Sequence, residues 1–510
     1  MVLLTIAVLA AAIALYYHFT VIYNYWRDQH VPGPRPIPIF GNTFKFCLGS
    51  TSLGVILKEL YDDYKTEKVV GLYRMRTPCL LIRDLDTVKH VLIKDFHVFL
   101  DRGVTFSRKG LGTNLFHADG ETWRALRHRF SPMFSNQKLK KMMYLLKDRA
   151  DLFIEYVSEV IAVSPEQDVH ALMKKYTMST IWACAFGFDV DTFREEIHAS
   201  LKKIDQAIFN RHLIIEFEMM YPGLPKKLKM DLFPGFMQDF FKNLVEKVST
   251  ERKGVPSTRN DFMDMLLQIK NNEDIENSKK LDDEEADAFE ITTRVIEAQV
   301  FAFYVAGYET SVSTMGFMLY QLALNPGIQE RLRKEVDEYL QRNGGRIKID
   351  TLKELTYMEQ VFNETLRMYP IVEHLRRKAQ ADYECPGTNV KVSKGQLVLI
   401  SVWGIHHDKL HYPVPEKFNP ENFSPENIAS RHPCAYLPFG VGPRHCIATR
   451  FALIQTRICI IRLLSRFRLE ASKNTIRSFS YDPLRIPLTP AEPIYVNIFP
   501  RKDARSNTIN

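Results

Sequence analysis

The chain has 510 residues, 45% of them hydrophobic and 25% charged, with a formal net charge of +8. This composition is that of an ordinary globular protein with a large core, and the charge is too moderate for nucleic acid to be an expected partner. Seven scattered cysteines without a CxxC pair argue against a disulfide framework and against a zinc or iron–sulfur site.

The N-terminal segment 1–26 contains no Asp, Glu, Lys or Arg, and residues 1–17 are almost wholly apolar. About 20 such residues span a bilayer as a helix. A cleavable signal peptide is the alternative, but the basic n-region of such a peptide is absent. The first basic residue, Arg27, follows the segment, which favours a body on the cytosolic side. We predict a membrane signal anchor over 1–26.

A basic, proline-rich linker is predicted over 27–42. Prolines at 32, 34, 36 and 38 forbid helix there and favour a stiff, extended chain. The remaining residues, 43–510, are predicted to form one globular domain.

The first part of this domain combines two strands with many helices. Strands are predicted at Val69–Arg76 and Leu80–Arg83, around a turn at Thr77-Pro78. Helical patterns dominate from Asp86 to about Phe262. The strongly charged stretch 273–290 is predicted to be an exposed loop.

The longest helical segment is Ile291–Leu324, which Asn325-Pro326-Gly327 ends. It is apolar nearly all round, as in a core helix or a membrane span. Glu309 near its middle argues against lipid exposure, so we predict a central core helix. A hairpin at Val390–Val392 and Gln396–Val402 completes a mainly α fold with a small β region.

The middle of this helix carries a cluster that could do chemistry. Gly307 weakens the helix and allows close approach to its backbone, and the Thr310 hydroxyl can bond the Ala306 carbonyl and bend the helix. Glu309 and Thr310 together can order water and relay protons. A packing notch between helices is the alternative interpretation.

Cys446 is the most informative residue. It follows a turn built on Gly440, Gly442 and Pro443, and two basic residues, Arg444 and His445, stand just before it. A helical pattern follows. A thiolate at a helix N-terminus beside positive charge is stabilised over the thiol, and such a thiolate suits an axial haem ligand. The alternative is a buried structural cysteine.

An acid and a base lie on one helical face at Glu364 and Arg367. The same ExxR spacing occurs at Glu121/Arg124, Glu330/Arg333 and Glu373/Arg376, so spacing alone means little. Glu364 and Arg367 are selected by their place upstream of Cys446 and by the helix stop at Pro370.

These motifs, in this order, resemble those of the cytochromes P-450. The residues around the motifs resemble those of animal microsomal members, above all the insect detoxification branch. Phe439, Gly442 and Cys446 match the pattern FxxGxxxCxG, with Ala448 at the usual glycine. Residues 306–311 match [AG]Gx[DE]T[ST]. Glu364 and Arg367 match ExxR, whose usual third partner, an arginine, is replaced here by Asn422.

The resemblance implies a haem b site in which Cys446 ligates the iron. It further implies that Thr310 and Glu309 help deliver protons during oxygen activation. The remaining cofactor-binding residues that it implies, including the propionate contacts of a WxxxR motif, are Trp123, Arg127, Ala306, Gly307, Arg377, Phe439 and Arg444.

The implied protein is a single-domain cytochrome P-450 fold behind its anchor, in the endoplasmic reticulum membrane with the catalytic domain on the cytosolic face. The implied activity is haem-thiolate monooxygenation of an apolar organic substrate, either a xenobiotic or an endogenous lipid or hormone. One atom of O2 enters the substrate. Electrons come from NADPH through NADPH-cytochrome reductase, with cytochrome b5 as an optional second partner.

Two rival functions remain open: a haem-thiolate isomerase or dehydratase, and a non-catalytic haem- or ligand-binding protein. By resemblance the substrate pocket draws on segments in which Glu373 and His374 are unusually polar. These two either recognise a basic or hydroxylated compound or face solvent. The pocket segments are Val104–Phe116, Phe301–Ala306, Ile371–Leu375 and Leu484–Ile486.

A surface cluster of basic residues between 124 and 141 could dock an acidic protein partner. A solvated surface is the alternative. The cluster consists of Arg124, Arg127, Arg129, Lys138, Lys140 and Lys141.

Overall fold

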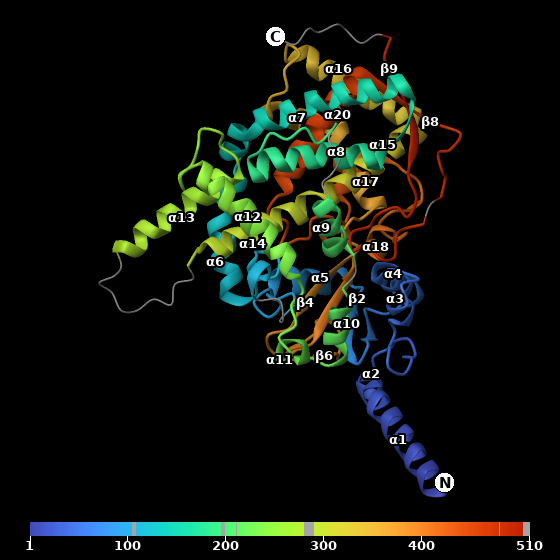
Figure 1. The fold of residues 1–510 in the computed structure, drawn as a ribbon. Coiled ribbons are helices and arrows are strands. Elements are labelled where there is room, and N and C mark those ends of the chain that lie inside the picture. The colour runs from blue at the N-terminus through green and yellow to red at the C-terminus, as the bar shows by residue number, and fades with distance from the viewer. Residues whose placement is uncertain (105–108, 195–198, 211, 280–289, 479, 503–510) are drawn as a thin grey trace.

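The computed structural model describes residues 1–104, 109–194, 199–210, 212–279, 290–478 and 480–502. One apolar helix, α1 (Val2–Thr20), projects from a body made mostly of helices with a smaller sheet region (Figure 1). The other α-helices are α2 (Tyr25–Asp28), α3 (Phe44–Cys47), α4 (Leu53–Asp63), α5 (Leu85–Lys89), α6 (Gly120–Phe130), α7 (Asn136–Val163), α8 (Val169–Ile181), α9 (Ala199–Phe209), α10 (Leu213–Met220), α11 (Leu224–Lys227), α12 (Gly235–Glu251), α13 (Phe262–Lys279), α14 (Thr293–Gly307), α15 (Glu309–Leu324), α16 (Pro326–Arg342), α17 (Thr356–Met368), α18 (Val402–His406), α19 (Pro425–Ala429) and α20 (Thr449–Arg466).

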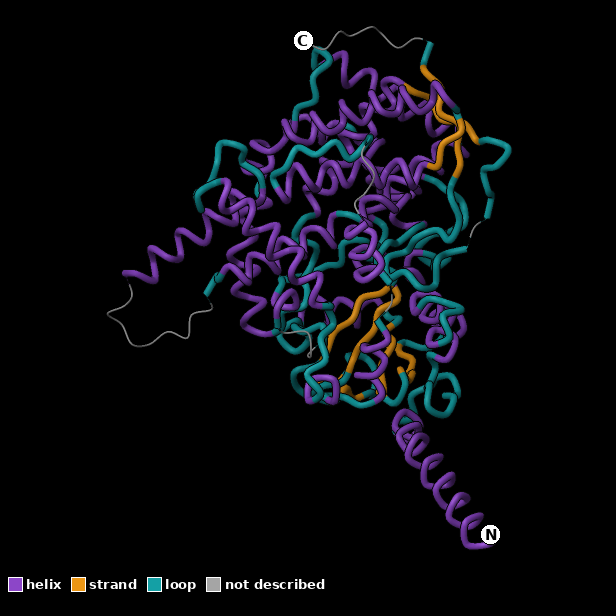
Figure 2. Tube along the Cα trace, in the orientation of Figure 1, coloured by secondary structure: helices purple, strands orange, loops and turns teal. Residues whose placement is uncertain are grey.

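The strands form separate small sheets, which Figure 2 shows in orange among the purple helices. The main sheet has the order β1-β2-β7-β4, a second has the order β3-β9-β8, and β5 pairs with β6. The strands are β1 (Val69–Arg74), β2 (Thr77–Ile82), β3 (Glu166–Asp168), β4 (His374–Lys378), β5 (Tyr383–Glu384), β6 (Lys391–Val392), β7 (Leu397–Ser401), β8 (Phe467–Ala471) and β9 (Tyr495–Pro500). The mainly α fold with a small β region is therefore confirmed.

The main sheet is buried on both faces. Leu81 and Leu399 are directly paired and pack on one face with α4 and α10. Leu80 and Val398, one residue earlier on each strand, pack on the other face toward Leu437, which precedes the cysteine loop. Because side chains alternate along a strand, the register assigns every residue of β4 to one of these faces.

The predicted central core helix is confirmed, in two pieces. α14 ends at Gly307 and α15 begins at Glu309, and Tyr308 between them has φ −78° and ψ −83°, outside helical values. α15 contacts α8, α16, α17 and α20, and it is buried nearly all round. An apolar helix of this kind is stable only when other elements cover every side.

Two predicted details of the β region are wrong. The turn predicted at Thr77-Pro78 lies instead at Met75 and Arg76, because Thr77 already pairs with Arg74 in the ladder between β1 and β2. The predicted hairpin at 390–402 does not form: β6 pairs with β5, whereas β7 lies between β2 and β4. All five residues of β7 are buried, which is typical of a central strand whose partners come from distant segments.

The charged stretch that begins at residue 273 is not a loop throughout. α13 continues to Lys279, so the predicted loop is wrong for its first residues, and residues 280–289 lie outside the described part of the chain. Charged residues are common on an exposed helix face, and composition therefore could not place the helix end.

The N-terminal helix is long and apolar enough to cross a membrane, with a mean hydropathy of 2.1 over its best window and none of that window buried. Trp26, at the end of the predicted anchor, belongs to the body instead. It is buried, packs where Gly71 lacks a side chain, and donates from Nε1 to the Leu72 carbonyl at 3.1 Å. The linker predicted over 27–42 is extended only in part: α2 includes Arg27 and Asp28, residues 31–36 run along the body with the Pro32 carbonyl accepting from Gly71 N, and residues 37–42 form a turn closed by the Ile37–Gly41 bridge.

Candidate haem-binding site

The loop before Cys446 requires its glycines. Gly440 has φ +67° and Gly442 has φ +75°, values that favour glycine. A Cβ on Gly442 would also lie 2.0 Å from the Leu92 carbonyl oxygen. The Cys446 amide donates to the Phe439 carbonyl at 2.9 Å, which closes the loop. Backbone geometry therefore fixes where the thiol lies.

The surroundings of the Cys446 thiol push its pKa in opposite directions. Burial raises the pKa, while the Ala448 amide, the Thr449 hydroxyl and the charges of Arg127 and Arg102 lower it. Burial is the larger effect, so the pKa lies above its ordinary value. The stabilising contacts predicted for a thiolate are present, and a bound metal ion would complete the deprotonation because it binds the thiolate alone.

Ala448 occupies the position of a family glycine without backbone strain. Its φ is −95° and ψ is 14°, values open to any L-residue, and α20 begins at the next residue. Its methyl group packs partly buried against the main core. Alanine therefore fits here, whereas it would not fit at Gly440 or Gly442.

One face of α14 is accessible in the middle of the molecule. Ala306 is exposed and Gly307 and Thr310 are partly exposed, whereas Tyr304 and Tyr308 are buried. In the described part of the chain, a Cβ added to Gly307 would meet only the Ile181 side chain, at an ordinary contact distance of 3.6 Å. A packing notch between helices does not account for this glycine, so the accessible face is available to a ligand.

Thr310 and Glu309 have different surroundings. The Thr310 hydroxyl donates to the Ala306 carbonyl, as predicted, and remains partly accessible. Glu309 is fully buried. One of its oxygens lies 3.2 Å from Arg485 Nη2, and the other accepts from Thr489 at 3.3 Å and lies 3.7 Å from His170 Nε2.

Glu309 is therefore held as a carboxylate. Burial alone would raise its pKa, but the His170 ring and the Arg485 charge outweigh burial and lower the pKa to about 2. Arg485 also binds Asp205 of α9 at 2.9 Å. Glu309 joins α15 to the C-terminal segment and to α9, a role that the motif alone did not reveal.

Two predicted propionate-binding arginines have unused donors. Arg444 is 4% exposed; its Nη2 donates to the Ala118 carbonyl at 2.6 Å, but its buried Nε and Nη1 have no hydrogen-bond partner in the described chain. Arg377 is 2% exposed, and its Nε likewise lacks a described partner. Buried guanidinium nitrogens without acceptors are costly, which indicates that a ligand supplies the acceptors.

Trp123 and Arg127, one turn apart on α6, complete the predicted set. The Arg444 guanidinium carbon lies 4.6 Å above the Trp123 ring, and Arg127 Nη1 donates to the His445 carbonyl at 2.9 Å. The WxxxR motif thus lies directly against the cysteine loop.

Sequence reasoning missed Arg102. Burial and then the Arg444 charge lower its pKa to about 9, against the opposing charge of Asp119; burial and then Arg102 lower the pKa of Arg377 to about 9. Like charges gathered in this way need an anion nearby. The carboxylates of a haem fit, and no motif or spacing in the sequence marks Arg102.

The predicted ExxR pair is buried and fully satisfied. Arg367 binds both Glu364 oxygens at 2.7 and 2.8 Å and donates to the His406 and Pro415 carbonyls. Asn422 donates to both Glu364 oxygens at 3.1 and 3.2 Å, in place of the usual arginine. His406 in turn accepts from Leu437 N at 2.8 Å, which ties the cluster to the cysteine loop.

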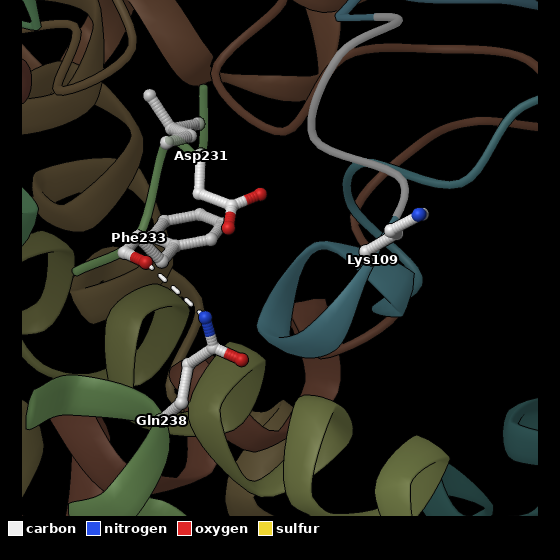
Figure 3. A pocket seen from close by; sticks show the side chains of 5 residues that line it. Lys109, Asp231, Phe233 and Gln238 are labelled. Atoms are coloured by element: carbon white, nitrogen blue, oxygen red, sulfur yellow. Dashed lines mark hydrogen bonds between the residues drawn. The ribbon is translucent and has the colours of Figure 1, made fainter. Parts of the chain in front are cut away.

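A small hollow beside α12 is not the site. It has essentially no room for a water-sized molecule, whereas ligand pockets usually begin at roughly 300 Å³. Figure 3 shows Gln238 donating to the Phe233 carbonyl across it. None of the predicted haem-binding residues lines it.

The basic surface cluster is partly neutralised. Arg124 pairs with Glu121 at 3.1 Å, and Lys140 pairs with Asp350. Lys138 donates to Gln268. The remaining charge is compatible with either interpretation of this surface.

Comparison with known proteins agrees with this geometry. The family model "Cytochrome P450" matches residues 31–498. Cytochrome P450 6B2 of Helicoverpa armigera is 50% identical over 491 residues, covering 96% of this chain and 97% of that protein. Cytochrome P450 6B1 of Papilio polyxenes is 47% identical over 487 residues, with 96% and 97% covered. The probable cytochrome P450 6a14 of Drosophila melanogaster is 35% identical over 509 residues, with 97% and 99% covered.

The site is that of a haem-thiolate protein. The chain belongs to the cytochrome P450 family, and the predicted resemblance to its insect branch is confirmed. It is accordingly a monooxygenase that uses haem b, O2 and NADPH-derived electrons delivered by a reductase. The family and the apolar N-terminal helix together indicate membrane anchoring.

Proposed function

We propose that this chain oxygenates small apolar organic molecules, with haem held by Cys446 on the iron and by a ring of arginines on the propionates. The observation that carries the proposal is the set of buried guanidinium nitrogens on Arg377 and Arg444 that lack described partners close to the Cys446 loop. Trp123, Arg127 and Arg102 supply further donors and positive charge. In this proposal Phe439, Ala306 and Gly307 also contact the haem.

Thr310 is the residue best suited to hold a proton or a water beside the haem. Its hydroxyl lies on the accessible face of the central helix, whereas Glu309 is engaged by Arg485. In this proposal Thr310 itself holds the proton or water. Glu309 instead fixes the position of α15 and keeps a negative charge at the start of that helix. Haem supplies the oxygen chemistry, and these residues supply orientation and proton transfer.

The substrate class follows from the predicted pocket segments. Phe116 and Ile486 are large apolar side chains that are 55% and 51% exposed. Backbone hydrogen bonds join Ile486 N to the Phe209 carbonyl and Leu488 N to the Ile371 carbonyl. The C-terminal segment therefore brings two distant parts of the predicted pocket together, and apolar surface of this kind favours an apolar ligand.

Glu373 does not take part in the proposed substrate contact. It is 5% exposed, and its Oε1 accepts from the Ser52 hydroxyl at 2.8 Å. The alternative in which Glu373 faces solvent is therefore wrong.

The orientation and the partners are proposed on charge and connectivity. Arg27 follows the apolar helix, so the catalytic domain lies on the cytosolic face of the endoplasmic reticulum membrane. The partly basic surface around α6 and α7 suits an acidic NADPH-cytochrome reductase, and cytochrome b5 as an optional second partner.

The test is turnover of the full-length protein with reductase and NADPH on a panel of apolar compounds, alongside the carbon monoxide spectrum. We expect a thiolate-type spectrum and NADPH-dependent product. Product formed without NADPH would favour the isomerase or dehydratase. A thiolate-type spectrum without any product across the panel would favour a haem- or ligand-binding protein.

A further inference from the structure

One side chain of the central helix anchors a wall of the predicted substrate pocket. Gln299 lies on α14 and is fully buried. Its Oε1 accepts from the Leu115 amide at 3.0 Å, and its Nε2 donates to the Thr113 carbonyl at 3.4 Å. Gln299 thereby joins the helix that carries the predicted pocket segment Phe301–Ala306 to the predicted pocket segment Val104–Phe116.

The anchored segment, the pocket wall Leu111–His117, holds its own shape. The buried Asn114 side chain donates from Nδ2 to the Leu111 carbonyl at 2.6 Å. Its Oδ1 accepts from the amides of Phe116 at 2.9 Å and His117 at 3.1 Å. An asparagine side chain that binds the backbone amides after it closes a tight turn. The pocket wall therefore moves as one unit.

The pocket wall presents an aromatic ring near the cysteine loop. The Phe116 side chain is more than half exposed, and the Arg102 guanidinium carbon lies 4.1 Å from the centre of its ring. Arg102 Nη1 also donates to the Phe116 carbonyl at 2.7 Å. The same Arg102 charge acts on the Cys446 thiol, whose pKa it lowers. A large apolar side chain held exposed in this way is a preformed contact surface for an apolar ligand.

Aromatic contacts also connect the pocket wall to α14. The His117 ring meets the Phe233 ring edge-on at 5.4 Å, and Phe233 meets Phe301 of α14 at 4.8 Å. Such apolar contacts are non-directional, whereas hydrogen bonds need defined distances and angles. The Gln299 amide is therefore the contact that fixes the position of the pocket wall along α14.

We infer that Gln299 is a positioning residue that holds the pocket wall as a preformed apolar surface, and that it thereby favours bulky aromatic substrates over small ones. Gln299 acts through Leu115 and Phe116 and does not itself touch the substrate. A surface that is already in place costs less entropy to bind than one that a ligand must order. This inference names a size class of substrate for the proposed monooxygenase and rests on that function.

The test compares imidazole with 4-phenylimidazole on the purified holoprotein, with dissociation constants taken from the shift of the Soret band. Both bind iron through a ring nitrogen, but only the larger one carries an aromatic ring to contact the pocket wall. Gln299→Met keeps the length of the side chain and removes both hydrogen bonds. It should weaken binding of 4-phenylimidazole by roughly 3- to 10-fold, the range of one ordinary hydrogen bond, and leave imidazole binding unchanged.

The matched control is Gln329→Met on α16. Gln329 is also buried, and its side chain binds the Leu469 amide at 2.9 Å and the Leu469 carbonyl at 2.8 Å. This variant should lose a similar amount of stability in urea unfolding and change neither dissociation constant. Gln299→Glu is the rescue variant. A buried carboxyl group stays protonated, so it can still accept from Leu115 and donate to Thr113, and it should restore the wild-type constants.

A double-mutant cycle separates positioning from general loosening. Phe116→Ala should weaken 4-phenylimidazole binding by itself, and adding Gln299→Met should then weaken it little further, because the positioned ring is absent. Equal losses for both ligands, no loss or tighter binding for 4-phenylimidazole, the same loss in Gln329→Met, or fully additive losses in the cycle would overturn the inference.

Two further outcomes are distinguishable. Loss of haem from Gln299→Met but not from Gln329→Met would overturn the inference and make Gln299 a residue that holds the haem. Failure of the monooxygenase is separate: no NADPH-dependent product from the wild-type protein would contradict the proposed activity. The dissociation constants need no electrons, so they still report on Gln299.

Discussion

Two buried polar clusters near the cysteine loop differ in how completely they are satisfied. In the first, Glu364, Arg367 and Asn422 bind one another and nearby carbonyls, and both charged side chains are fully buried. In the second, Arg377 and Arg444 keep buried nitrogens without described partners. The first cluster holds the fold by itself, and the second is complete only with an anionic ligand. Single partnerless nitrogens also occur on arginines of structural ion pairs, such as Arg74 and Arg259, so the mark of the second cluster is that several such donors gather beside the Cys446 loop.

The largest effect should come from replacing Cys446, the predicted iron ligand, whose loop lies near both clusters. Cys446→Ser should abolish the thiolate-type carbon monoxide spectrum and all product, because a neutral hydroxyl cannot replace the thiolate. Cys434→Ser, at a buried cysteine twelve residues earlier (446 − 434), should leave both largely intact. Haem ligation that depends on Cys434 would show that the haem-binding motif is assigned to the wrong cysteine.

The satisfied cluster should affect stability. Arg367→Ala leaves the buried Glu364 carboxylate without its counterion, which should cost about 3–5 kcal/mol of folding free energy. Arg331→Ala breaks the exposed pair with Glu421, and its cost should stay below about 1 kcal/mol. Urea unfolding of the holoprotein measures both. Equal costs would remove the distinction between the two kinds of ion pair.

The unsatisfied cluster should affect haem retention instead. Arg444→Gln should speed haem transfer to an acceptor globin by roughly 10- to 100-fold, with a smaller change in the unfolding of the apoprotein. Arg346→Gln, at an exposed arginine after α16, serves as the control. If Arg444→Gln destabilised the apoprotein as strongly as Arg367→Ala, the two clusters would have the same role.

A smaller effect is expected on the accessible helix face. Thr310→Ala should lower product and raise peroxide while NADPH consumption continues. A positioned proton-transfer group is worth about 10²–10⁴-fold, and water replaces part of it. Thr314→Ala is matched, because the Thr314 hydroxyl donates to a carbonyl four residues back, that of Thr310, at 2.7 Å. If Thr310→Ala left the ratio of product to consumed NADPH unchanged, Thr310 would have only a helix-bending role.

The smallest effect concerns Glu373, a buried carboxylate bound to Ser52 rather than to a cation. Burial raises its pKa to about 7 from a usual 4.5. Between these values the folded protein keeps a proton that the unfolded chain releases, so stability falls as pH rises through this window. Glu373→Gln should therefore stabilise the protein at pH 8 by roughly 1–3 kcal/mol and have little effect at pH 5. The exposed Glu416→Gln should show no such pH dependence.

The sequence predicted the parts of the molecule that local chemistry determines. The glycine turn before Cys446, the core helix around Gly307 and the Glu364–Arg367 pair all depend on residues close together in the chain. The middle of the linker, residues 31–36, has no helix, as its prolines predict.

The remaining features depend on partners distant in the sequence. The local sequence of β7 predicts one strand of a hairpin, but β7 pairs with β2 and β4 instead. Glu309 meets Arg485 across 176 residues of sequence (485 − 309), and that contact changes its role from an open acid to a buried ion pair. Arg102 and Trp26 have no motif, and only packing shows what they contact.

The most direct test of the monooxygenase assignment is a turnover under ¹⁸O₂ with reductase, NADPH and an apolar substrate that shifts the Soret band. We predict one ¹⁸O atom in each product molecule and one in water, with no product from Cys446→Ser. Product that carries no ¹⁸O, formed by protein with intact haem, would contradict the assignment.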